Sequence, residues 1–511
     1  MARNLVVFCD GTWNTTDQRE NGVPCPTNVV KLHNLCLKDE QQLCYYHPGV
    51  GTEGGIGHRI LGGGLGRGLS QNIMSAYNWL CRNYQAGDQI FLFGFSRGAY
   101  TVRSLGGFVA RCGLLDVSEL AEKAAWNAVE QIYQQCYRGN GSMSRLRRKY
   151  RFLAPGTDEG GVQIHMIGVW DTVGALGVPD DMVLLDQVFD DPDNYRFHNT
   201  SLSDSVCHAR HAVAMDERRA SFAPTLWDPR PAATGHSLEQ IWFPGVHSDV
   251  GGGYPECGLS DVALMWMASE AKSLGLRIEE KLFEDITPNA RGVLHDSVSG
   301  IWEHMRTLPR AAPPVTEESV TNKSIDGSVL LRHQLPPLTQ APYWPTCRMA
   351  EGEQTTLPIF SRQHWNRTGI YLEAGKNYAF SATGEWLDAS IACGPSGAAD
   401  GKFHVGEIAY IVGDLFGEAE ELYKRITRKE NSDWRVTRRF EDGHWFALIG
   451  MVANQPNADG GGTPSPGETF VIGKRKVFGP KRSGYLYCYA NDAWSFYGNN
   501  RGQVSLTVQC R

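Results

Sequence analysis

The sequence lacks the patterns that mark several classes of protein. Its 13 cysteines include no CxxC pair and follow no regular spacing, which argues against a disulfide framework. No basic run exceeds the cluster Arg145, Arg147, Arg148 and Lys149, and the formal charge of −7 is mild. We therefore expect reduced, mostly buried thiols and no nucleic acid partner.

A long hydrophobic run at the start is also missing. The segment MARNLVVFCDGTWN has only a short apolar stretch before a turn motif, so neither a signal peptide nor a transmembrane span is expected. This predicts a protein that is cytoplasmic in the producing cell and that, if exported, uses a route needing no Sec signal.

The first part of the chain alternates apolar runs with helical patterns. The runs at 5–8, 89–95, 163–170 and 240–247 each end among glycines or charged residues, and helical spacing follows at 69–84, 99–110 and 260–274. Alternation of this kind predicts an α/β fold with a mostly parallel sheet covered by helices on both faces. Functional groups are then expected at the carboxyl ends of the strands.

The pattern changes beyond Arg332. Prolines at 336, 337, 342 and 345 predict a stiff connector, after which short alternating runs separated by turns are typical of a β-sandwich. A chain of 511 residues exceeds what one core usually organises. We expect an α/β-hydrolase-like domain at 1–335 with a cap at 274–334, a Pro-rich linker at 336–354, and an all-β sandwich domain at 355–511.

One candidate nucleophile stands out. Ser96 lies in GFSRG, a GxSxG pattern between a predicted strand and a predicted helix, which is the context of a nucleophile elbow. The backbone N–H of Arg97 would then face the oxyanion. The alternative is an ordinary glycine-rich turn with an idle serine.

A serine needs a histidine to take its proton and a carboxylate to orient that histidine. Asp171 in GVWDTVG and His247 in GVHSDVG follow Ser96 in the chain order of this fold class, at predicted strand ends. A rival set has Asp249 as the acid and His295 as the base. Otherwise Asp249 is a neighbour that braces the loop and His295 is structural.

Other interpretations of GVHSDVGGGY are weaker. Its glycines match neither GxxxxGK[ST] nor GxGxxG, and no HxxxH or HxH pattern supports a metal at His247. The motif CDGT resembles the DxDGT of aspartate phosphatases, but Phe8 occupies the nucleophile position. Asp10, Gly11 and Thr12 fit a loop near the oxyanion, with Gly11 or Thr12 supplying a second N–H.

Seven motifs, in order over roughly residues 1 to 310, carry a resemblance: FCDGTWN, YYHPGVGTEGG, GLSQNIMSAYNWL, GDQIFLFGFSRGAYTVRSLGGF, VWDTVGALG, MDERRASF and WFPGVHSDVGGGY. Together they resemble the α/β-hydrolase family that includes the type VI secretion phospholipase effectors of bacteria. The resemblance implies a triad of Ser96, Asp171 and His247 that hydrolyses carboxylic esters of phospholipids at a membrane surface. It also implies a secretion apparatus or an immunity protein as partner.

A second resemblance concerns the C-terminal region. YANDAWSFYGNNRGQVSLTV resembles the closing segment of the soluble galactophilic lectins of bacteria, which bind sugar through calcium. It implies a Ca²⁺ site formed by Asp492, Asn499, Asn500 and the carbonyl of Phe496, with Asp388 of GEWLDA nearby; these are oxygen donors that calcium prefers. CGPSGAADGK replaces the lectins' sugar loop, so galactose is not implied. Trp494 is a candidate contact for sugar or lipid.

Three functions are compatible with these patterns. The first is a phospholipase-type serine esterase with a glycan- or membrane-targeting domain. The second is a carbohydrate-binding protein whose hydrolase domain is weak or inactive. The third is an esterase acting on acylated sugars, which would use both sites.

Overall fold

The computed structural model describes residues 2–11, 14–15, 17–49, 65–139, 141–154, 161–174, 201–228, 235–299, 306–398, 438–457 and 466–511. The chain divides into two compact units, Met1–Tyr343 with Pro456–Ser465 and Trp344–Gln455 with Pro466–Arg511. We call these unit 1 and unit 2, and each is described by itself.

Unit 1 is built on a parallel sheet. Its strands are β1 (Asn4–Cys9), β4 (Gln42–His47), β5 (Gln89–Phe95), β8 (Ile164–Trp170), β9 (Val206–Ala214) and β10 (Ser237–Phe243). Their order is β10-β9-β8-β5-β1-β4, and every neighbouring pair is parallel. All carboxyl ends therefore meet at one edge of the sheet.

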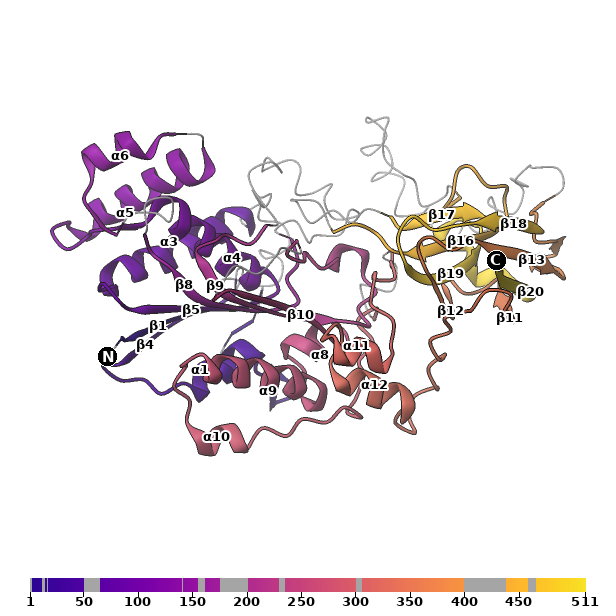
Figure 1. The fold of residues 1–511 in the computed structure, drawn as a ribbon, viewed down its shortest axis with the longest axis horizontal. Coiled ribbons are helices and arrows are strands. Elements are labelled where there is room, and N and C mark those ends of the chain that lie inside the picture. The colour runs from indigo at the N-terminus through magenta and orange to yellow at the C-terminus, as the bar shows by residue number, and fades with distance from the viewer. Residues whose placement is uncertain are drawn as a thin grey trace. The chain divides into compact units, whose positions relative to one another are not determined.

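Helices cover both faces of this sheet (Figure 1). One face packs against α3 (Leu65–Asn83), α4 (Arg97–Cys112), α5 (Glu122–Ile132), the π-helical turn Tyr133–Arg138 and α6 (Met143–Lys149), and the other against α1 (Asn28–Leu35) and α9 (Gly258–Ser273). Burial on both faces explains why β1 is apolar and buried nearly throughout. The predicted α/β architecture is confirmed.

Shorter elements complete unit 1. They are β2 (Arg19–Glu20), β3 (Val23–Pro24), β6 (Leu114–Leu115), β7 (Phe152–Ala154), the 3-10 turn Ala220–Phe222, α8 (His247–Gly251), α10 (Glu280–Glu284), α11 (Glu317–Thr321) and α12 (Gly327–Gln334). Over the stretches of chain described, no helix has the length and hydropathy needed to cross a bilayer.

The segment predicted to form a cap also covers one edge of the sheet. The Trp242 amide of β10 donates to Ser324 O at 3.1 Å, and the Asp326 amide donates to Trp242 O at 2.9 Å. Ile325 and Val329 pack with Trp242 in a small apolar cluster. This segment therefore satisfies the outer hydrogen-bonding groups of an edge strand.

Unit 2 consists of antiparallel strands with a short 3-10 helix. They are β11 (Gln354–Phe360), β12 (Asn366–Leu372), β13 (Tyr378–Thr383), β14 (Trp386–Asp388), β15 (Ile391–Cys393), β16 (Leu448–Ala453), β17 (Glu468–Val471), β18 (Arg475–Phe478), β19 (Gly484–Ala490), the 3-10 helix Trp494–Asn499 and β20 (Asn500–Cys510). One sheet has the order β15-β14-β20-β13-β18 with β11 on β20, and the other β12-β19-β16-β17.

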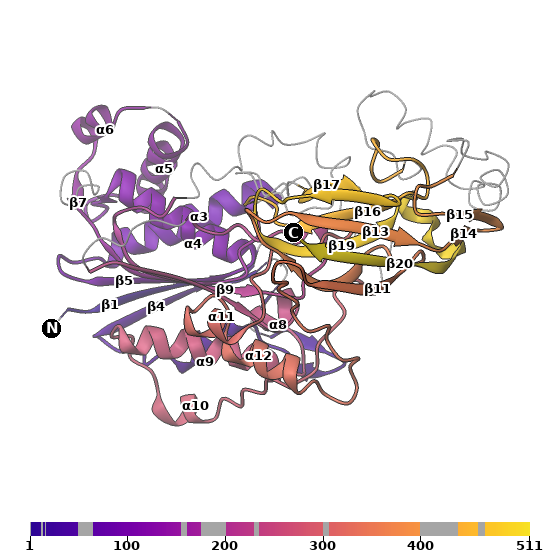
Figure 2. The ribbon, with the colours of Figure 1, turned by 45° about the vertical axis from the view of Figure 1, so that its right-hand side comes forward.

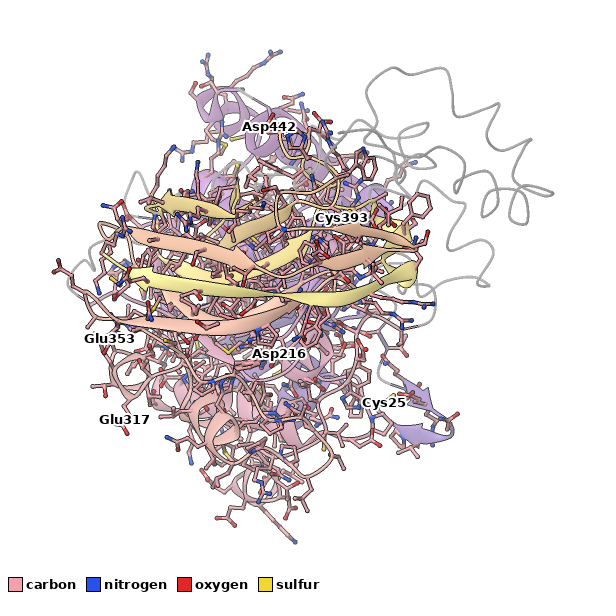
Figure 3. All side chains as sticks on the ribbon, turned by 90° about the vertical axis from the view of Figure 1, so that its right-hand side faces the viewer. Cys25, Asp216, Glu317, Glu353, Cys393 and Asp442 are labelled. Atoms are coloured by element: carbon pink, nitrogen blue, oxygen red, sulfur yellow. The ribbon has the colours of Figure 1, made fainter. Side chains whose placement is uncertain are left out.

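Both sheets contribute side chains to a shared apolar core, and Figure 2 shows their strands. Burial alternates along β13 and along most of β20, which agrees with one face of each strand pointing to that core. Figure 3 shows the β20 sheet face on, with Glu353 and Cys393 at opposite ends. The predicted all-β character of this region is confirmed.

Candidate active site

Ser96 lies between β5 and α4 in a conformation that non-glycine residues rarely adopt, with φ 56° and ψ −121°. The two glycines of GxSxG have a packing reason. A Cβ at Gly94 would lie within 3.0 Å of Gly98 O, and one at Gly98 would lie within 3.0 Å of Cys9 O at the end of β1. The turn therefore has the strain and close packing expected of a nucleophile elbow.

Asp171 and His247 meet at the same edge of the sheet. Asp171 follows β8 with a φ of 36° and is fully buried, while His247 opens α8 shortly after β10. His247 Nδ1 donates to Asp171 Oδ2 at 2.6 Å, and the Ala214 amide donates to Asp171 Oδ1 at 2.9 Å. With Nδ1 carrying the proton, Nε2 keeps a lone pair and can accept one.

Aromatic rings bring His247 next to the elbow. The ring of Phe95, the residue before Ser96, lies 4.6 Å from the His247 ring, and Phe222 meets the same imidazole edge-on at 4.9 Å. Within the described part of the chain the Ser96 hydroxyl makes no hydrogen bond. In ligand-free hydrolases the serine–histidine bond often forms only when substrate is bound.

An arginine that the sequence analysis did not identify completes the environment of Asp171. Arg310 Nη1 donates to Asp171 Oδ1 at 2.7 Å and Nη2 donates to Oδ2 at 3.0 Å. The same guanidinium donates to Ala214 O at 2.6 Å and Phe222 O at 2.5 Å. In sequence Arg310 stands alone in TLPRAAPP, where no motif or strand marks it.

Burial and charge set the protonation of this pair. Burial raises the pKa of Asp171, but the positive charge of Arg310 and the hydrogen bonds from His247 and Arg310 outweigh it, so the pKa lies far below its usual range. Burial lowers the pKa of His247 in spite of Asp171. At neutral pH the carboxylate is therefore ionised and the imidazole neutral, as a general base requires.

Glu217 was also missed, although it lies in the quoted motif MDERRASF. Its buried carboxylate accepts hydrogen bonds from Arg219 Nη2 at 2.8 Å, Ser297 Oγ at 2.8 Å and the His247 amide at 3.3 Å. Burial raises the pKa of Glu217, but Arg219 outweighs this and lowers it to about 2. Glu217 thus ties the start of α8 to its neighbours.

The rival pair is hydrogen-bonded too. His295 Nδ1 lies 2.5 Å from Asp249 Oδ1, and Asp249 Oδ2 accepts from the Val246 amide at 3.0 Å. The other ring nitrogen of His295 lies 3.4 Å from Glu256, and the ring stacks on Tyr254 at 3.8 Å. Asp249 therefore braces the turn that presents His247.

The glycines of GVHSDVGGGY serve close packing. A Cβ at Gly251 would lie within 3.0 Å of the Phe95 ring, and one at Gly252, with φ +81°, would lie within 3.0 Å of the Asn28 amide in α1. Gly252 also forms a β-bridge with Thr27. These residues let α8 lie directly against β5, the strand that ends just before Ser96.

Gly251→Ala is expected to destabilise the protein by about 1–3 kcal/mol, because the added methyl overpacks the core at Phe95. Since Phe95 contacts His247, the imidazole should shift as well. Urea unfolding measures the first effect, and the rate at which a fluorophosphonate labels Ser96 measures the second. Gly327→Ala, at a site where the nearest atom is Val320 Cγ1 at 3.9 Å, is the control; an equal loss there would contradict the packing argument.

The predicted oxyanion loop differs from expectation at one position. The Gly11 amide donates to Asp10 Oδ1 at 2.7 Å, so it is already engaged and does not point to an oxyanion. Asp10 also accepts from Thr27 Oγ1 at 2.8 Å and from Tyr46 OH at 2.9 Å. Burial raises the pKa of Asp10 to about 6 against these bonds. Asp10 therefore holds the loop beside Ser96, and Thr12 lies outside the described residues.

Arg97 is the first residue of α4. Backbone N–H groups in the first turn of a helix have no acceptor within the helix, and they carry its positive dipole end. The Arg97 amide is thus placed at the turn that carries Ser96. Gly11 is close to that turn as well, since a Cβ on it would lie 3.3 Å from Ser96 Cβ.

In unit 2 the four side chains predicted to bind calcium form two hydrogen-bonded pairs. Asn500 Nδ2 donates to Asp492 Oδ2 at 3.0 Å, and Asn499 Nδ2 donates to Asp388 Oδ1 at 3.2 Å. Among the described residues, the side-chain oxygens of Asn499 and Asn500 are buried and have no hydrogen-bond partner. Two carboxylates and two unpaired amide oxygens fit a hard cation that takes only oxygen ligands.

Trp494 lies next to this cluster and is half-buried. Its ring is 4.3 Å from that of His364, whose Nε2 lies 2.9 Å from Trp494 O. The Arg439 guanidinium lies over the Trp494 ring at 4.7 Å. Phe496 follows in the same 3-10 helix and is also half-buried. Trp494 is therefore part of an aromatic cluster and is not a lone exposed ring.

Several known proteins resemble parts of this chain. An uncharacterized protein of Saccharomyces cerevisiae is 32% identical over 246 residues, which are 45% of this chain and 33% of that protein. This chain thus spans about a third of its curated relative. The crystal structure of an uncharacterized protein from Pseudomonas aeruginosa is 18% identical, covering 57% of this chain and 49% of the other with a TM-score of 0.34.

Two further solved structures are similar to parts of this chain. The Tle1 effector bound to the VgrG spike of the type 6 secretion system is 18% identical, covering 50% of this chain and 52% of the other with a TM-score of 0.27. The EclA N-terminal domain, described as a PllA-like lectin, is 16% identical, covering 30% of this chain and 95% of the other with a TM-score of 0.19.

The family comparison covers most of unit 1. The model of the catalytic domain of Tle1-like phospholipase effectors of the type VI secretion system matches residues 3–270. The match includes Ser96, Asp171 and His247. Because it spans more than half of the 511 residues, this chain belongs to the family of Tle1-like phospholipase effectors of the type VI secretion system.

Proposed function

We propose that this protein is a serine esterase that hydrolyses carboxylic esters of phospholipids, with Ser96 as nucleophile, His247 as base and Asp171 as orienting acid. The observation that carries the proposal is the 2.6 Å bond from His247 Nδ1 to Asp171, formed beside the strained turn at Ser96. Family membership supports a phospholipid substrate and export through a type VI secretion apparatus.

The first half-reaction acylates the enzyme. His247 Nε2 takes the Ser96 proton as Oγ attacks the acyl carbon, and Asp171 stabilises the resulting imidazolium. The Arg97 amide donates to the oxyanion of the tetrahedral intermediate. The imidazolium then gives its proton to the leaving alcohol, which departs as the lysophospholipid.

The second half-reaction releases the fatty acid. His247 takes a proton from water, the hydroxide attacks the acyl carbon, and the same imidazolium returns the proton to Ser96 Oγ as the ester bond breaks. Ionised Asp171 and neutral His247 are the states that both half-reactions need at their start.

The substrate class is tested by offering two acyl esters to the pure protein. Phosphatidylethanolamine–phosphatidylglycerol vesicles and an acetylated oligosaccharide are incubated separately, and fatty acid, lysophospholipid and acetate are quantified by mass spectrometry. Release of fatty acid with its lysophospholipid is the expected result. Release of acetate alone would favour an esterase of acylated sugars, and no release from either would favour a carbohydrate-binding protein with an inactive hydrolase unit.

We also propose that unit 2 binds Ca²⁺ and holds the enzyme at a glycan or membrane surface. Asp492, Asn499 and Asn500 would supply side-chain oxygens, with Asp388 and the Phe496 carbonyl as further ligands. The unpaired amide oxygens of Asn499 and Asn500 support this proposal. When bound, the ion would offer open coordination positions to hydroxyl or phosphate oxygens.

Calcium binding is expected to depend on pH. Burial and the nearby charge of Asp388 raise the pKa of Asp492 to about 7, in spite of hydrogen bonds from Asn500 and Ala493. Because Ca²⁺ must displace this proton, its affinity should be weaker at pH 6 than at pH 8. Without calcium, folded unit 2 binds more protons than the unfolded chain between pH 3.8 and about 7, so its stability should fall as pH rises through that window.

Calorimetric titration with Ca²⁺ and thermal unfolding with and without a chelator measure both effects. Asp492→Asn keeps the side-chain shape but removes the charge, so it should abolish binding and the stabilisation by calcium. Glu353→Gln is the matched control and should bind normally, because the Glu353 carbonyl accepts from the amide of Cys510, at the end of β20 opposite Asn500. Equal affinity at both pH values, or unchanged binding by Asp492→Asn, would contradict the site.

A further inference from the structure

We infer that Arg310 is a positioning residue of the catalytic triad, and that the functional hydrolase unit therefore extends past residue 270, where the family match ends, to include the segment that carries this arginine. The inference rests on the proposed function of Ser96, Asp171 and His247.

The first argument is the geometry of the carboxylate. Both oxygens of Asp171 accept from the guanidinium, one at 2.7 Å and the other at 3.0 Å, which is the bidentate pairing that suits arginine and not lysine. Ala214 N supplies a third donor and His247 Nδ1 the fourth. Each oxygen thus has two donors, which leaves the carboxylate one orientation, the one that faces His247.

Second, Arg310 is itself anchored by further hydrogen bonds. Its side chain is 3% exposed, and it donates to the carbonyls of Ala214, at the end of β9, and Phe222, whose ring contacts His247. The guanidinium therefore connects the triad acid to the strand beside it and to the wall of the imidazole pocket. An arginine that only neutralised charge would not need these two carbonyls.

The third argument is electrostatic. A fully buried carboxylate that lacks a counter-charge either takes up a proton itself or keeps its histidine partner protonated. Arg310 supplies a permanent positive charge, so Asp171 can stay ionised while His247 is neutral. The other charged groups near His247 are Glu217 and Arg219, which pair with each other at 2.8 Å, and His211 near Asp171 is neutral because burial lowers its pKa to about 3. Among the residues that the structure describes, Arg310 is the one cation that contacts the carboxylate.

Removal of Arg310 should therefore change the pH dependence of the reaction and not only lower its rate. With Asp171 lacking its cation, the proton shared by the Asp171–His247 pair binds more tightly. The acidic limb of the kcat/KM–pH profile should move upward by about one unit or more in Arg310→Gln. The rate at the pH optimum should also fall at least about tenfold, because the imidazole is less well oriented.

The experiment measures kcat/KM from pH 5 to 9 with a short-chain phospholipid, together with thermal unfolding, for the full chain. Arg310→Lys keeps the positive charge but loses the bidentate geometry of the guanidinium. It should therefore leave the acidic limb near its wild-type position while lowering the rate. Arg332→Lys is the control: Arg332 is equally buried, but it donates only to neutral acceptors, the carbonyls of Ala290 and Gly292, Gln340 Oε1 and Tyr343 OH.

The outcomes separate this inference from the proposed function. If Arg310→Gln is less stable but its acidic limb stays in place, as in Arg332→Lys, Arg310 is merely structural and the inference is wrong. Should Arg310→Gln fail to fold, Arg310→Lys decides, since an unchanged rate there would also overturn the inference. If the wild-type protein hydrolyses no ester and Ser96 does not react with a fluorophosphonate, the proposed function fails instead.

Discussion

Ser96→Ala is expected to lower kcat for phospholipid hydrolysis by about 10⁴-fold or more, because the nucleophile of a covalent mechanism is removed. The strained φ of 56° at this position supports the expectation, since a turn of that kind is retained where it positions a side chain for chemistry. Alanine at the same φ differs from serine only in lacking the hydroxyl. The folded state and vesicle binding should therefore persist, and lysophospholipid release measures the loss.

Ser260→Ala is the control for this variant. Ser260 is as buried as Ser96, but its hydroxyl donates to the Cys257 carbonyl at 3.0 Å in the first turn of α9. It should retain most activity. Unchanged hydrolysis by Ser96→Ala would assign the chemistry to another residue.

Asp171→Asn is expected to reduce kcat by about 10⁴-fold, since an amide in place of the acid leaves His247 in the wrong tautomer. A second effect is specific to this site. The guanidinium of Arg310 would face a neutral amide with its charge uncompensated in the interior, which typically costs about 3–5 kcal/mol. Stability in urea and kcat at pH 8 measure the two losses separately.

Asp249→Asn is the informative comparison for Asp171→Asn. Asp249 pairs with His295, whose other ring nitrogen is near Glu256, so its replacement should weaken the turn before His247 but cost much less activity. A larger rate loss in Asp249→Asn than in Asp171→Asn would favour the rival pair of Asp249 and His295 as acid and base.

Much of unit 1 could be predicted because its local patterns agree with its tertiary structure. The strands β1, β5 and β8 are mostly apolar runs, and a residue of the predicted site follows each of them, as Asp171 follows β8. The glycines around Ser96 could be recognised since a strained strand-to-helix turn leaves a local signature. Alternation and periodicity predicted the α/β character of unit 1 and the all-β character of unit 2, but β4 and β9, which mix polar and apolar residues, were not predicted as strands.

What could not be predicted depends on contacts distant in sequence. Arg310 meets Asp171 across 139 residues, and a lone arginine among prolines has no periodicity to mark it. Glu217 stood in a recognisable motif, but its bond to the His247 amide depends on where β9 and β10 end. The engaged amide of Gly11 was missed for a similar reason, because the turn folds the Asp10 side chain back onto it.

The proposed calcium site shows the same division. Asp492, Asn499 and Asn500 fall in one short segment, so a motif could bring them to attention. Asp388 joins them through the pairing of β14 with β20, where it lies opposite Asn500. The unpaired oxygens that make the cluster suitable for a cation are a property of the fold and not of the motif.

The most direct test of the central claim is active-site labelling. The full chain is treated with a fluorophosphonate, digested and mapped by mass spectrometry, alongside His247→Ala and the control His295→Ala. We predict a stoichiometric adduct on Ser96 that forms in wild type and His295→Ala but not in His247→Ala. An adduct on a different serine, or labelling of Ser96 that depends on His295 and not on His247, would contradict it.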